Sequence, residues 1–365
     1  MNLVRLLTAV ALSSQAWADV TVPLQAIRNV EREGGGNEKA TQAWKELVSA
    51  KAAELPALLA GMDGANPLAQ NWIRAAVGTI EDRESQSLPV DELERFVRNT
   101  QHSPEARALA FDILHRHAPA KAEALTSQLM EDPGPELRRH PVAKLLEDGN
   151  ALLAKGDKEA AAAAYQKALN SARDEDQIKP LAKKLRELGK TVDLPSHFGF
   201  LMNWKVIAPF DNGERKGFDA VYPPEQKLDF AATYPGRAKE AKWADFTSTD
   251  EYGKIDFNKP FGMEKEVVGY AATEFISKDA RPAEIRIGCK NGWKVWLNGK
   301  LLFARDEYHR GAKLDQYKLP CELQAGKNVI LVKCCQNEQK ETWTVEWEFQ
   351  LRVCDATGTA IIASR

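Results

Sequence analysis

A polar segment in the last third of the chain holds the residue types best suited to recognising a ligand. It gathers charged, amide and aromatic side chains in a short stretch, namely Arg305, Glu307, Tyr308, His309, Arg310, Asp315, Gln316 and Tyr317. Trp296, just before it, shares a face of an expected strand with Lys294 and Asn298, so it is the best candidate for an exposed aromatic platform. Polar groups beside an aromatic wall suit an array of sugar hydroxyl groups. The predicted ligand site therefore comprises Trp296, Arg305, Glu307, Tyr308, His309, Asp315 and Gln316.

Two other interpretations of this segment stay open. It is also compatible with a polar loop whose side chains bond to its own backbone. An enzyme that hydrolyses glycosidic bonds would need two carboxylates about 5 to 10 Å apart, and Glu307, Asp315 and Glu341 are available for that role. Because no nucleophile elbow, HExxH motif or phosphate-binding loop accompanies them, we expect no catalytic residue and a binding function.

Aspartates between Pro209 and Gly262 raise the question of a bound cation. They are Asp211, Asp219, Asp229, Asp245, Asp250 and Asp256. Calcium takes several oxygen ligands from a constrained loop, and these residues lack the spacing of a known calcium loop. We expect no cofactor and no metal site, with a structural calcium ion left as an open alternative.

The five cysteines, all after residue 200, also lack metal-site spacing. They are Cys289, Cys321, Cys334, Cys335 and Cys354. Without paired CxxC units a zinc site is not expected. Small buried thiols, with one or two disulfide bonds, are the simplest interpretation, and the sequence does not say which residues pair. Cys334 and Cys335 should point to opposite faces if they lie in a strand.

The composition is that of a folded protein without a strong overall charge. The 365 residues are 44% hydrophobic and 28% charged, and 50 basic residues nearly balance 52 acidic ones, for a net charge of -2. This length favours two or three domains. Since no general positive field exists to hold phosphate groups, we expect no nucleic-acid partner.

The first residues have the three parts of a secretory signal peptide. Arg5 supplies the positive start, residues 6–12 the apolar run, and Ala16-Trp17-Ala18 the cleavage site. The apolar run ends at Ser13, after about half the length that a membrane span needs. We expect residues 1–18 to be removed and the mature chain, without an integral membrane segment, to be secreted or periplasmic.

Apolar residues recur at helical spacing through the first half of the chain, which predicts amphipathic helices. Three helices are expected to open with a capping residue followed by proline, at Asn66-Pro67, Ser103-Pro104 and Asp132-Pro133. These openings recur at roughly the length of a two-helix repeat. Residues 19–140 therefore resemble HEAT-like repeats, which stack into a solenoid used for protein contacts. An unpatterned helical bundle is the alternative.

A second helical pattern covers residues 141–190. It rests on Gly149, Gly156, Ala161, Tyr165 and Ala168, which fall at the offsets of a tetratricopeptide (TPR) repeat. Small residues would let two helices approach closely, Gly156 would make the turn, and Tyr165 would fill the groove. The chain departs from that family's leucine and aromatic at Asp148 and Leu152. A single repeat makes no peptide groove, so we expect these helices to join the solenoid to the strand-rich half of the chain.

After an expected linker at residues 191–199, the apolar period changes from that of helices to that of strands. The clearest alternation runs from Trp343 to Val353 and places Trp343 and Trp347 in the core. Residues 284–302 predict a meander of neighbouring strands with a hairpin at Asn298-Gly299, and residues 329–334 another strand. The long stretch from Pro209 to Gly262 is expected to wall a cleft or to cover an edge strand. So many short strands predict two packed sheets.

Four segments of this second half together resemble the galactose-binding-like β-sandwich domain of secreted bacterial proteins. They are Trp204–Phe210, Tyr222–Glu225, Val295–Lys300 and Trp343–Asp355. The resemblance covers residues 200–365 and implies a jelly roll that binds carbohydrate or mediates adhesion, often with a structural calcium ion. Such a fold hosts many roles and does not by itself identify a ligand. The predicted fold class is a multidomain chain of α plus all-β type, an N-terminal HEAT/TPR-like α-solenoid followed by an antiparallel β-sandwich.

Three functions remain open on this basis. The preferred one is an exported noncatalytic binding or scaffold protein, in which the β-sandwich recognises carbohydrate or cell-envelope material and the helical repeats bind a protein partner. The first alternative is a carbohydrate-active hydrolase or its accessory subunit. The second is a purely structural scaffold whose two halves contact only proteins.

Overall fold

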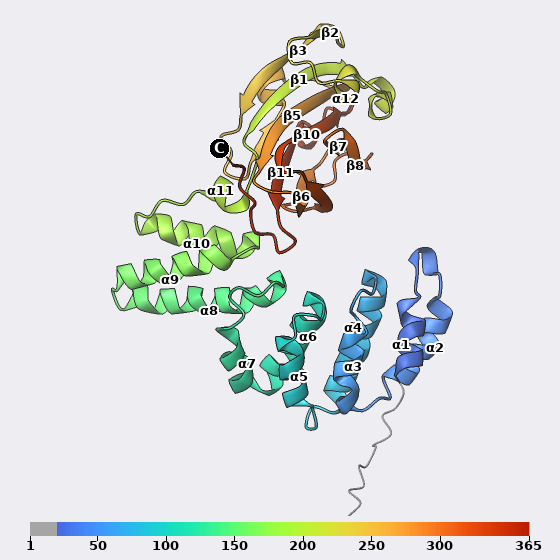
Figure 1. Cartoon of the computed structure of the whole chain (residues 1–365), viewed down its shortest axis with the longest axis vertical. Helices are drawn as coiled ribbons and strands as arrows, with labels where there is room; N and C mark the ends of the chain where they lie inside the picture. The colour runs from blue at the N-terminus through green and yellow to red at the C-terminus, as the bar shows by residue number, and fades with distance from the viewer. Residues whose placement is uncertain (1–19, 365) are drawn as a thin grey trace, which may run out of the picture. The chain divides into compact units, whose positions relative to one another are not determined.

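The computed structural model describes residues 20–364, so the expected signal peptide lies outside the described residues. The chain divides into two compact units between Leu145 and Leu146, inside helix α8 (Pro135–Ala154). Helices dominate the first part of the chain, and two antiparallel sheets form the later part (Figure 1). This combination confirms the predicted mixture of α and β structure.

The first unit consists of short helices that pack mainly against helices near them in the sequence. Their bounds are α1 (Thr21–Arg28), η1 (Arg32–Gly34), α2 (Asn37–Leu47), η2 (Ala52–Glu54), α3 (Leu55–Ala60), α4 (Pro67–Arg83), α5 (Val90–Arg98), α6 (Pro104–His117) and α7 (Pro119–Thr126). The inward faces form one apolar core that runs from Val20 to Leu137. Nowhere in residues 20–364 does a helix combine the length and the apolar character that a membrane crossing requires.

Two of the predicted helix caps are confirmed. The Asn66 side-chain oxygen accepts a hydrogen bond from the Ala69 backbone N–H at 3.0 Å, and the Ser103 hydroxyl accepts one from the Ala106 N–H at 3.3 Å. In each case the following proline is the first helical residue. These bonds satisfy backbone donors that a helix start leaves without an intrahelical partner.

The third predicted opening is wrong in its position. Helix α8 begins at Pro135 rather than at Pro133. The Asp132 carboxylate instead accepts two hydrogen bonds from the Arg107 guanidinium, at 2.9 and 2.6 Å, and both residues are buried. This long-range ion pair has no local signature, so the sequence pattern indicated a simple cap at Asp132.

The second unit opens with the remainder of α8, followed by α9 (Lys158–Ser171), α10 (Glu175–Glu187) and α11 (Leu194–Phe198). Tyr165 is fully buried against Gly149, where an added Cβ would come within 3.0 Å of three ring atoms. Gly156 adopts a left-handed conformation, φ +86°, in the turn between α8 and α9. The close helix packing and the turn predicted for these residues are therefore present.

Two antiparallel sheets make up the rest of the second unit. The larger has the strand order β2-β3-β1-β5-β10-β7-β8, and the smaller β4-β11-β6-β9. The strands are β1 (Asn203–Asp211), β2 (Thr233–Pro235), β3 (Glu240–Thr247), β4 (Lys254–Asp256), β5 (Val267–Ser277), β6 (Arg281–Cys289), β7 (Gly292–Leu297), β8 (Lys300–Arg305), β9 (Tyr317–Leu323), β10 (Gly326–Gln336) and β11 (Glu348–Cys354). Short helical segments between them are η3 (Gly213–Phe218), α12 (Pro223–Gln226), α13 (Asn258–Phe261) and η4 (Thr342–Thr344).

The inner faces of the two sheets share a single apolar core. Ile287 of β6 and Phe349 of β11 come from the smaller sheet, and they belong to the same buried cluster as Val295 of β7 and Val332 of β10 from the larger sheet. Trp347 is in this cluster and fully buried, as predicted. Two sheets in this arrangement hide the apolar face that either one alone would expose to water.

The meander predicted for residues 284–302 is wrong in one respect. Strand β6 lies in the smaller sheet and β7 in the larger, so the chain changes sheets at Lys290 and Asn291. Apolar alternation identifies which side chains face inward, but the inner faces of two facing sheets have the same pattern. The hairpin between β7 and β8 is confirmed, because Asn298 and Gly299 both have positive φ, +52° and +80°.

The segment between Pro209 and Gly262 is not simply a loop. It supplies β2 and β3 at one edge of the larger sheet and β4 at the edge of the smaller sheet. Phe218, from η3, packs with Tyr270 and Trp296 in a second apolar cluster on the outer face of the larger sheet. The segment therefore covers this face as well as extending the sheet.

A fully buried lysine attaches this cover to the sheet. The Lys333 ammonium donates to the backbone oxygens of Phe218 and Ala220 at 3.0 and 2.7 Å and to the Glu225 carboxylate at 2.9 Å. Burial lowers the pKa of Lys333, although the Glu225 carboxylate opposes this effect. Such a charge is tolerated because its donors are all satisfied.

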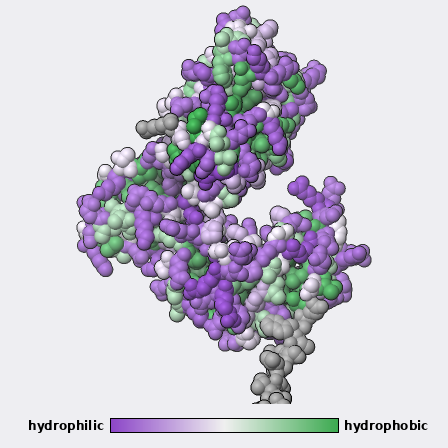
Figure 2. All heavy atoms as spheres, viewed as in Figure 1, coloured by the Kyte–Doolittle hydropathy of each residue, from purple (hydrophilic) through white to green (hydrophobic). Residues whose placement is uncertain are grey.

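Hydrophilic residues predominate on the face drawn in Figure 2, and hydrophobic residues appear there in separated groups. The large hydrophobic side chains that are exposed lie far apart in the sequence, at Val22, Leu68, Val221, Phe230, Met263, Leu301, Trp343 and Ile362. Of the tryptophans in the described part of the chain, Trp343 alone is exposed, with 58% of its surface accessible. An exposed indole offers a large amphipathic surface, so Trp343 is a candidate contact for a ligand.

Candidate binding site

A depression of about 440 Å³ surrounds Trp343 in the second unit. Its lining consists of Arg215, Asp306, Tyr308, His309, Gln339 and Trp343. Three separate segments supply these side chains: η3, the residues after β8, and the residues between β10 and β11. The depression therefore depends on the sheets to bring together loops that are distant in the sequence.

Two rings form its aromatic part. Trp343 and His309 meet edge to face, with ring centroids 5.4 Å apart and planes at 87°. The His309 ring nitrogen Nε2 lies 3.0 Å from the side-chain oxygen of Asn337, and its backbone N–H donates to the Lys290 oxygen at 2.7 Å. His309 is thus held at both its backbone and its ring while Trp343 stays open to solvent.

Tyr308 forms the floor on the Arg215 side. Its hydroxyl accepts a hydrogen bond from the Asn212 amide at 3.1 Å, and the Arg215 guanidinium lies over its ring at 5.2 Å. Burial raises the pKa of Tyr308, so the phenol stays neutral. The Tyr308 ring packs closely against the backbone of Gly292. An added Cβ at Gly292 would lie 3.2 Å from the ring carbon that bears the hydroxyl.

Charged groups of both signs stand at the rim. Arg215 makes a two-point ion pair with Glu338, with nitrogen to oxygen distances of 3.1 and 2.6 Å. This bond raises the pKa of Arg215, and desolvation followed by the nearby charge of Asp219 raises the pKa of Asp306. The rim therefore offers fixed hydrogen-bond donors and acceptors without a strong net charge.

Buried amides support the depression from beneath. Asn212, Asn291, Gln336 and Asn337 are each at most 1% exposed. Asn212 donates to the Gln336 backbone oxygen at 2.8 Å, Asn291 donates to the Gln336 side chain at 3.2 Å, and Asn337 holds His309. These bonds hold the groups of the lining in one geometry. The side-chain oxygens of Asn212 and Asn291 are nevertheless buried without a hydrogen-bond partner, so the network is only partly satisfied.

This arrangement can bind a small ligand. An exposed indole offers a flat apolar surface, while the tyrosine, histidine and amide groups around it offer directed hydrogen bonds. Ligand sites commonly combine an apolar wall with a few convergent polar groups. A small ligand with one apolar face and a polar edge matches these groups.

Two of the seven predicted site residues, Tyr308 and His309, line the depression. Trp296 does not, because only 8% of it is exposed and it packs with Phe218 and Tyr270 under the covering segment. Its assignment to the face opposite the core was right, but that face is itself covered. Trp296 therefore provides no platform for a ligand.

Three other predicted residues have local partners outside the depression. Arg305 and Glu307 form an ion pair with each other, and Glu307 also contacts Arg310 at 3.1 Å. The Gln316 side chain accepts from the Cys289 backbone N–H at 3.1 Å and donates to the Gly311 oxygen at 3.2 Å. These contacts engage the three side chains with neighbouring residues and leave them outside the lining of the depression.

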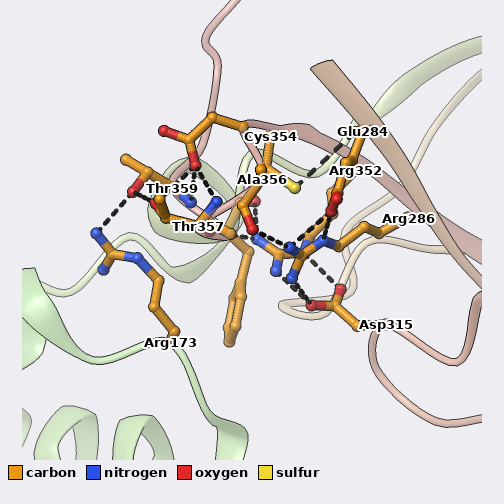
Figure 3. Close-up of polar contacts among 12 residues, drawn as sticks. Arg173, Glu284, Arg286, Asp315, Arg352, Cys354, Ala356, Thr357 and Thr359 are labelled. Carbon is orange, nitrogen blue, oxygen red and sulfur yellow. Dashed lines mark hydrogen bonds and ion pairs between the residues drawn. The ribbon is translucent and has the colours of Figure 1, made fainter. Parts of the chain in front are cut away.

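Asp315 lies between two buried arginines, Arg286 and Arg352 (Figure 3). Its carboxylate accepts from Arg352 Nε at 2.7 Å and from Arg286 Nη1 at 2.7 Å, and both arginines are at most 5% exposed. Burial alone would raise the pKa of Asp315, but the hydrogen bonds and charges of the two arginines outweigh it and lower the pKa. Arg352 also donates to the backbone oxygens of Phe198 and Gly358, so the group ties several segments together.

Four residues of the lining were not predicted from the sequence: Arg215, Asp306, Gln339 and Trp343. The prediction that Trp343 is a core residue of a strand is wrong, since it lies in η4 and β11 begins only at Glu348. A usable signal was present, because an unbroken polar run from Gln336 to Thr342 precedes Trp343 and is typical of a loop. Nothing local marks the other three.

The aspartates considered as calcium ligands are dispersed. Asp211 pairs with Arg237 at 3.0 Å and Asp245 with Lys205 at 2.7 Å. Asp250 accepts a hydrogen bond within its own turn. Within residues 20–364 no group of three or more histidine, cysteine or acidic residues is placed to hold a metal ion.

A larger hollow of about 830 Å³ lies where the start of β6, the hairpin between β7 and β8, and β9 meet. Its lining mixes Arg281, Lys300 and Glu322 with apolar side chains such as Leu302 and Pro320. None of the described residues that line it is aromatic. It therefore lacks the flat aromatic surface that Trp343 provides in the smaller depression.

Comparison with known proteins leaves the family open. No protein-family model and no curated protein matches the chain. Among solved structures, a GH31 α-xylosidase from Xanthomonas citri is 9% identical, with a TM-score of 0.21 over 43% of this chain and 16% of that chain. A β-glucosidase from Kluyveromyces marxianus is 10% identical, with a TM-score of 0.26 over 78% of this chain and 36% of that chain. Likeness this weak carries no argument about fold or activity.

Proposed function

We propose that this chain is an exported, noncatalytic binding protein whose two-sheet unit, a galactose-binding-like jelly roll, binds carbohydrate at the depression around Trp343. The observation that carries the proposal is the exposed indole of Trp343, set beside His309 in a depression with a polar rim. The buried amides under Tyr308 and His309 support it, because they hold the lining ready for a ligand.

Carbohydrate fits these groups better than a wholly apolar ligand does. A pyranose ring has one face of C–H groups that can lie on an indole and an edge of hydroxyl groups that need hydrogen-bond partners. Asp306 and Gln339, which line the depression, have hydrogen-bonding side chains that suit such an edge. The volume of about 440 Å³ lies in the range of roughly 300 to 1,000 Å³ usual for small-molecule sites.

The test is a glycan array probed with the wild-type chain, followed by titration calorimetry with the best oligosaccharide. Trp343→Ala should weaken binding at least about tenfold, since truncation of an aromatic anchor commonly costs about 2 kcal/mol or more and about 1.4 kcal/mol is tenfold. Its melting temperature should stay unchanged, because Trp343 is exposed. Phe230→Ala, which removes another exposed aromatic outside the depression, serves as the matched control and should bind like wild type.

Two results would count against the proposal. If no glycan on the array is bound, carbohydrate is excluded as the ligand class. If Trp343→Ala binds with wild-type affinity, the depression around Trp343 is excluded as the binding site. The first result would favour the purely structural scaffold, in which an alignment of relatives should show an exposed conserved patch on the helices and none around Trp343.

For the helices we propose HEAT- and TPR-like repeats that form a solenoid and bind a protein partner. Supporting this are the confirmed caps at Asn66 and Ser103, which open two successive long helices, and the packing of Tyr165 on Gly149. Repeats of this kind use an extended surface for protein contacts.

Hydrolysis is the less favoured alternative. A glycoside hydrolase needs two carboxylates about 5 to 10 Å apart on either side of the bond. Asp306 is the one carboxylate among the described residues that line the depression. Glu338 directly precedes Gln339 in the sequence, but its carboxylate forms an ion pair with Arg215.

A further inference from the structure

Two cysteines from different sheets lie side by side in the core. Cys289 ends β6 in the smaller sheet, and Cys334 lies in β10 of the larger sheet. Their sulfur atoms are 3.8 Å apart, and the residues are 3% and 0% exposed. The adjacent Cys335 is equally buried but belongs to the apolar cluster on the other face of its sheet.

The path of the chain explains why these two thiols meet. Only Lys290 and Asn291 separate Cys289 from the start of β7, so the chain passes from one sheet to the other directly after Cys289. In the larger sheet, Trp293 of β7 is the register partner of Cys334. The two sulfur atoms therefore face each other at the corner where the chain changes sheets.

We propose that Cys289 and Cys334 form a disulfide bond in the mature protein, which joins the two sheets covalently. A disulfide has a sulfur to sulfur distance of about 2.05 Å, so the two sulfur atoms, now 3.8 Å apart, have to approach each other by roughly 2 Å for the bond to form. The bond would close a loop from residue 289 to residue 334. It adds a structural element to the protein and is independent of the proposed ligand.

The chemistry is thiol–disulfide exchange with an external disulfide such as oxidised glutathione. One cysteine thiolate attacks the external disulfide and releases a glutathione thiolate; the second cysteine thiolate then displaces the other glutathione. Overall, two thiols and one oxidised glutathione give one protein disulfide and two reduced glutathiones. The two cysteines lose two electrons, which the external disulfide accepts.

Burial dictates when this exchange takes place. Cys334 is fully buried, and burial raises its pKa well above the usual value, so thiolate is scarce once the sheets have closed. The bond should therefore form during folding. Folded, reduced protein should react with oxidised glutathione far more slowly than refolding protein.

The experiment starts from the whole chain, denatured and reduced, and refolds it at pH 8 in a mixture of reduced and oxidised glutathione. Tryptic peptides are then analysed by mass spectrometry without reduction. The expected product links the peptide that contains Cys289 to the peptide that contains Cys334 and Cys335. Fragmentation of the linked peptide between those two neighbours assigns the bond directly. Reduction should lower the melting temperature by roughly 5 to 15 °C, as expected for removal of a bond that closes a loop of this length.

Adjacent positions provide a matched pair of variants. Cys335→Ala should keep the link and its melting-temperature shift, whereas Cys334→Ala should lose both. The proposal is overturned if refolded wild-type chain contains no link to Cys289, if fragmentation assigns the bond to Cys335, or if Cys334→Ala retains the link. Because fragmentation uses the wild-type chain, the answer does not depend on whether either variant folds.

Discussion

Asp315 links two arginines that are almost fully buried, Arg286 and Arg352, and its loss would leave a charge without its partner. Asp315→Asn should lower the free energy of unfolding by about 3 to 5 kcal/mol, the usual effect of removing one member of a buried ion pair. Urea denaturation measures this value. Asp245→Asn, which removes a solvent-exposed pair with Lys205, should change it by less than about 1 kcal/mol.

The same carboxyl makes acid stability a second readout. Because the pKa of Asp315 is lowered in the folded state, its stabilisation is present above the unfolded-state pKa, about 3.9, and disappears as the pH falls through the lower folded-state value. Asp315→Asn should therefore show a smaller loss of stability below about pH 4 than wild type does. Equal acid sensitivity in both chains would mean that Asp315 is not held by the arginines.

The fate of single aromatic residues shows what local sequence can and cannot predict. The alternation predicts correctly that Trp347 is buried in the core between the sheets, although Trp347 precedes β11, and that Trp296 lies on the other face of β7. Burial of Trp296 depends on Phe218, which is far away in the sequence. Trp343 was assigned to a strand because its spacing continued the alternation, although the polar run before it indicated a loop.

At the scale of elements, Gly149 makes a clear prediction because Tyr165 occupies the space of its missing side chain. Gly149→Ala should destabilise the second unit by about 1 to 3 kcal/mol, since an added methyl group would clash with the buried ring. Gly78 in α4 is the matched control, because an added Cβ there meets nothing within 4 Å. Gly78→Ala should instead stabilise its helix by about 0.5 to 1 kcal/mol.

Thermal unfolding followed by circular dichroism checks both variants against wild type. The same substitution of glycine by alanine is expected to lower the stability at position 149 and to raise it at position 78. If Gly149→Ala gained stability as Gly78→Ala should, the close approach of α8 and α9 would be wrong.

The elements themselves were more predictable than their partners. Helical spacing and capping residues locate α4 and α6, and the Asn298-Gly299 turn locates the hairpin between β7 and β8. Assignment of β6 and β7 to different sheets escaped prediction, because the pairing of a strand is decided by long-range contacts. The lining of the depression escaped it for the same reason, since Arg215 follows β1 and Gln339 follows β10, two strands that are distant in sequence and come together only in the larger sheet.

For the whole molecule, two separate cores predict two unfolding transitions. The apolar core of the first unit includes Leu58, and the core between the two sheets includes Trp347; the two clusters have no residue in common. Cooperative unfolding follows contiguous packing, so each core should lose its structure as a unit. Differential scanning calorimetry of the full chain should therefore show two transitions rather than one.

Variants in each core assign these transitions. Leu58→Ala leaves a cavity in the first core and should lower only one melting temperature, consistent with a loss of about 2 to 5 kcal/mol. Asp315→Asn should lower only the other, because both of its arginine partners belong to the two-sheet part of the chain. A single transition that both substitutions shift equally would show that the units fold as one cooperative body, and would argue against the proposal that the helices are an independent docking module.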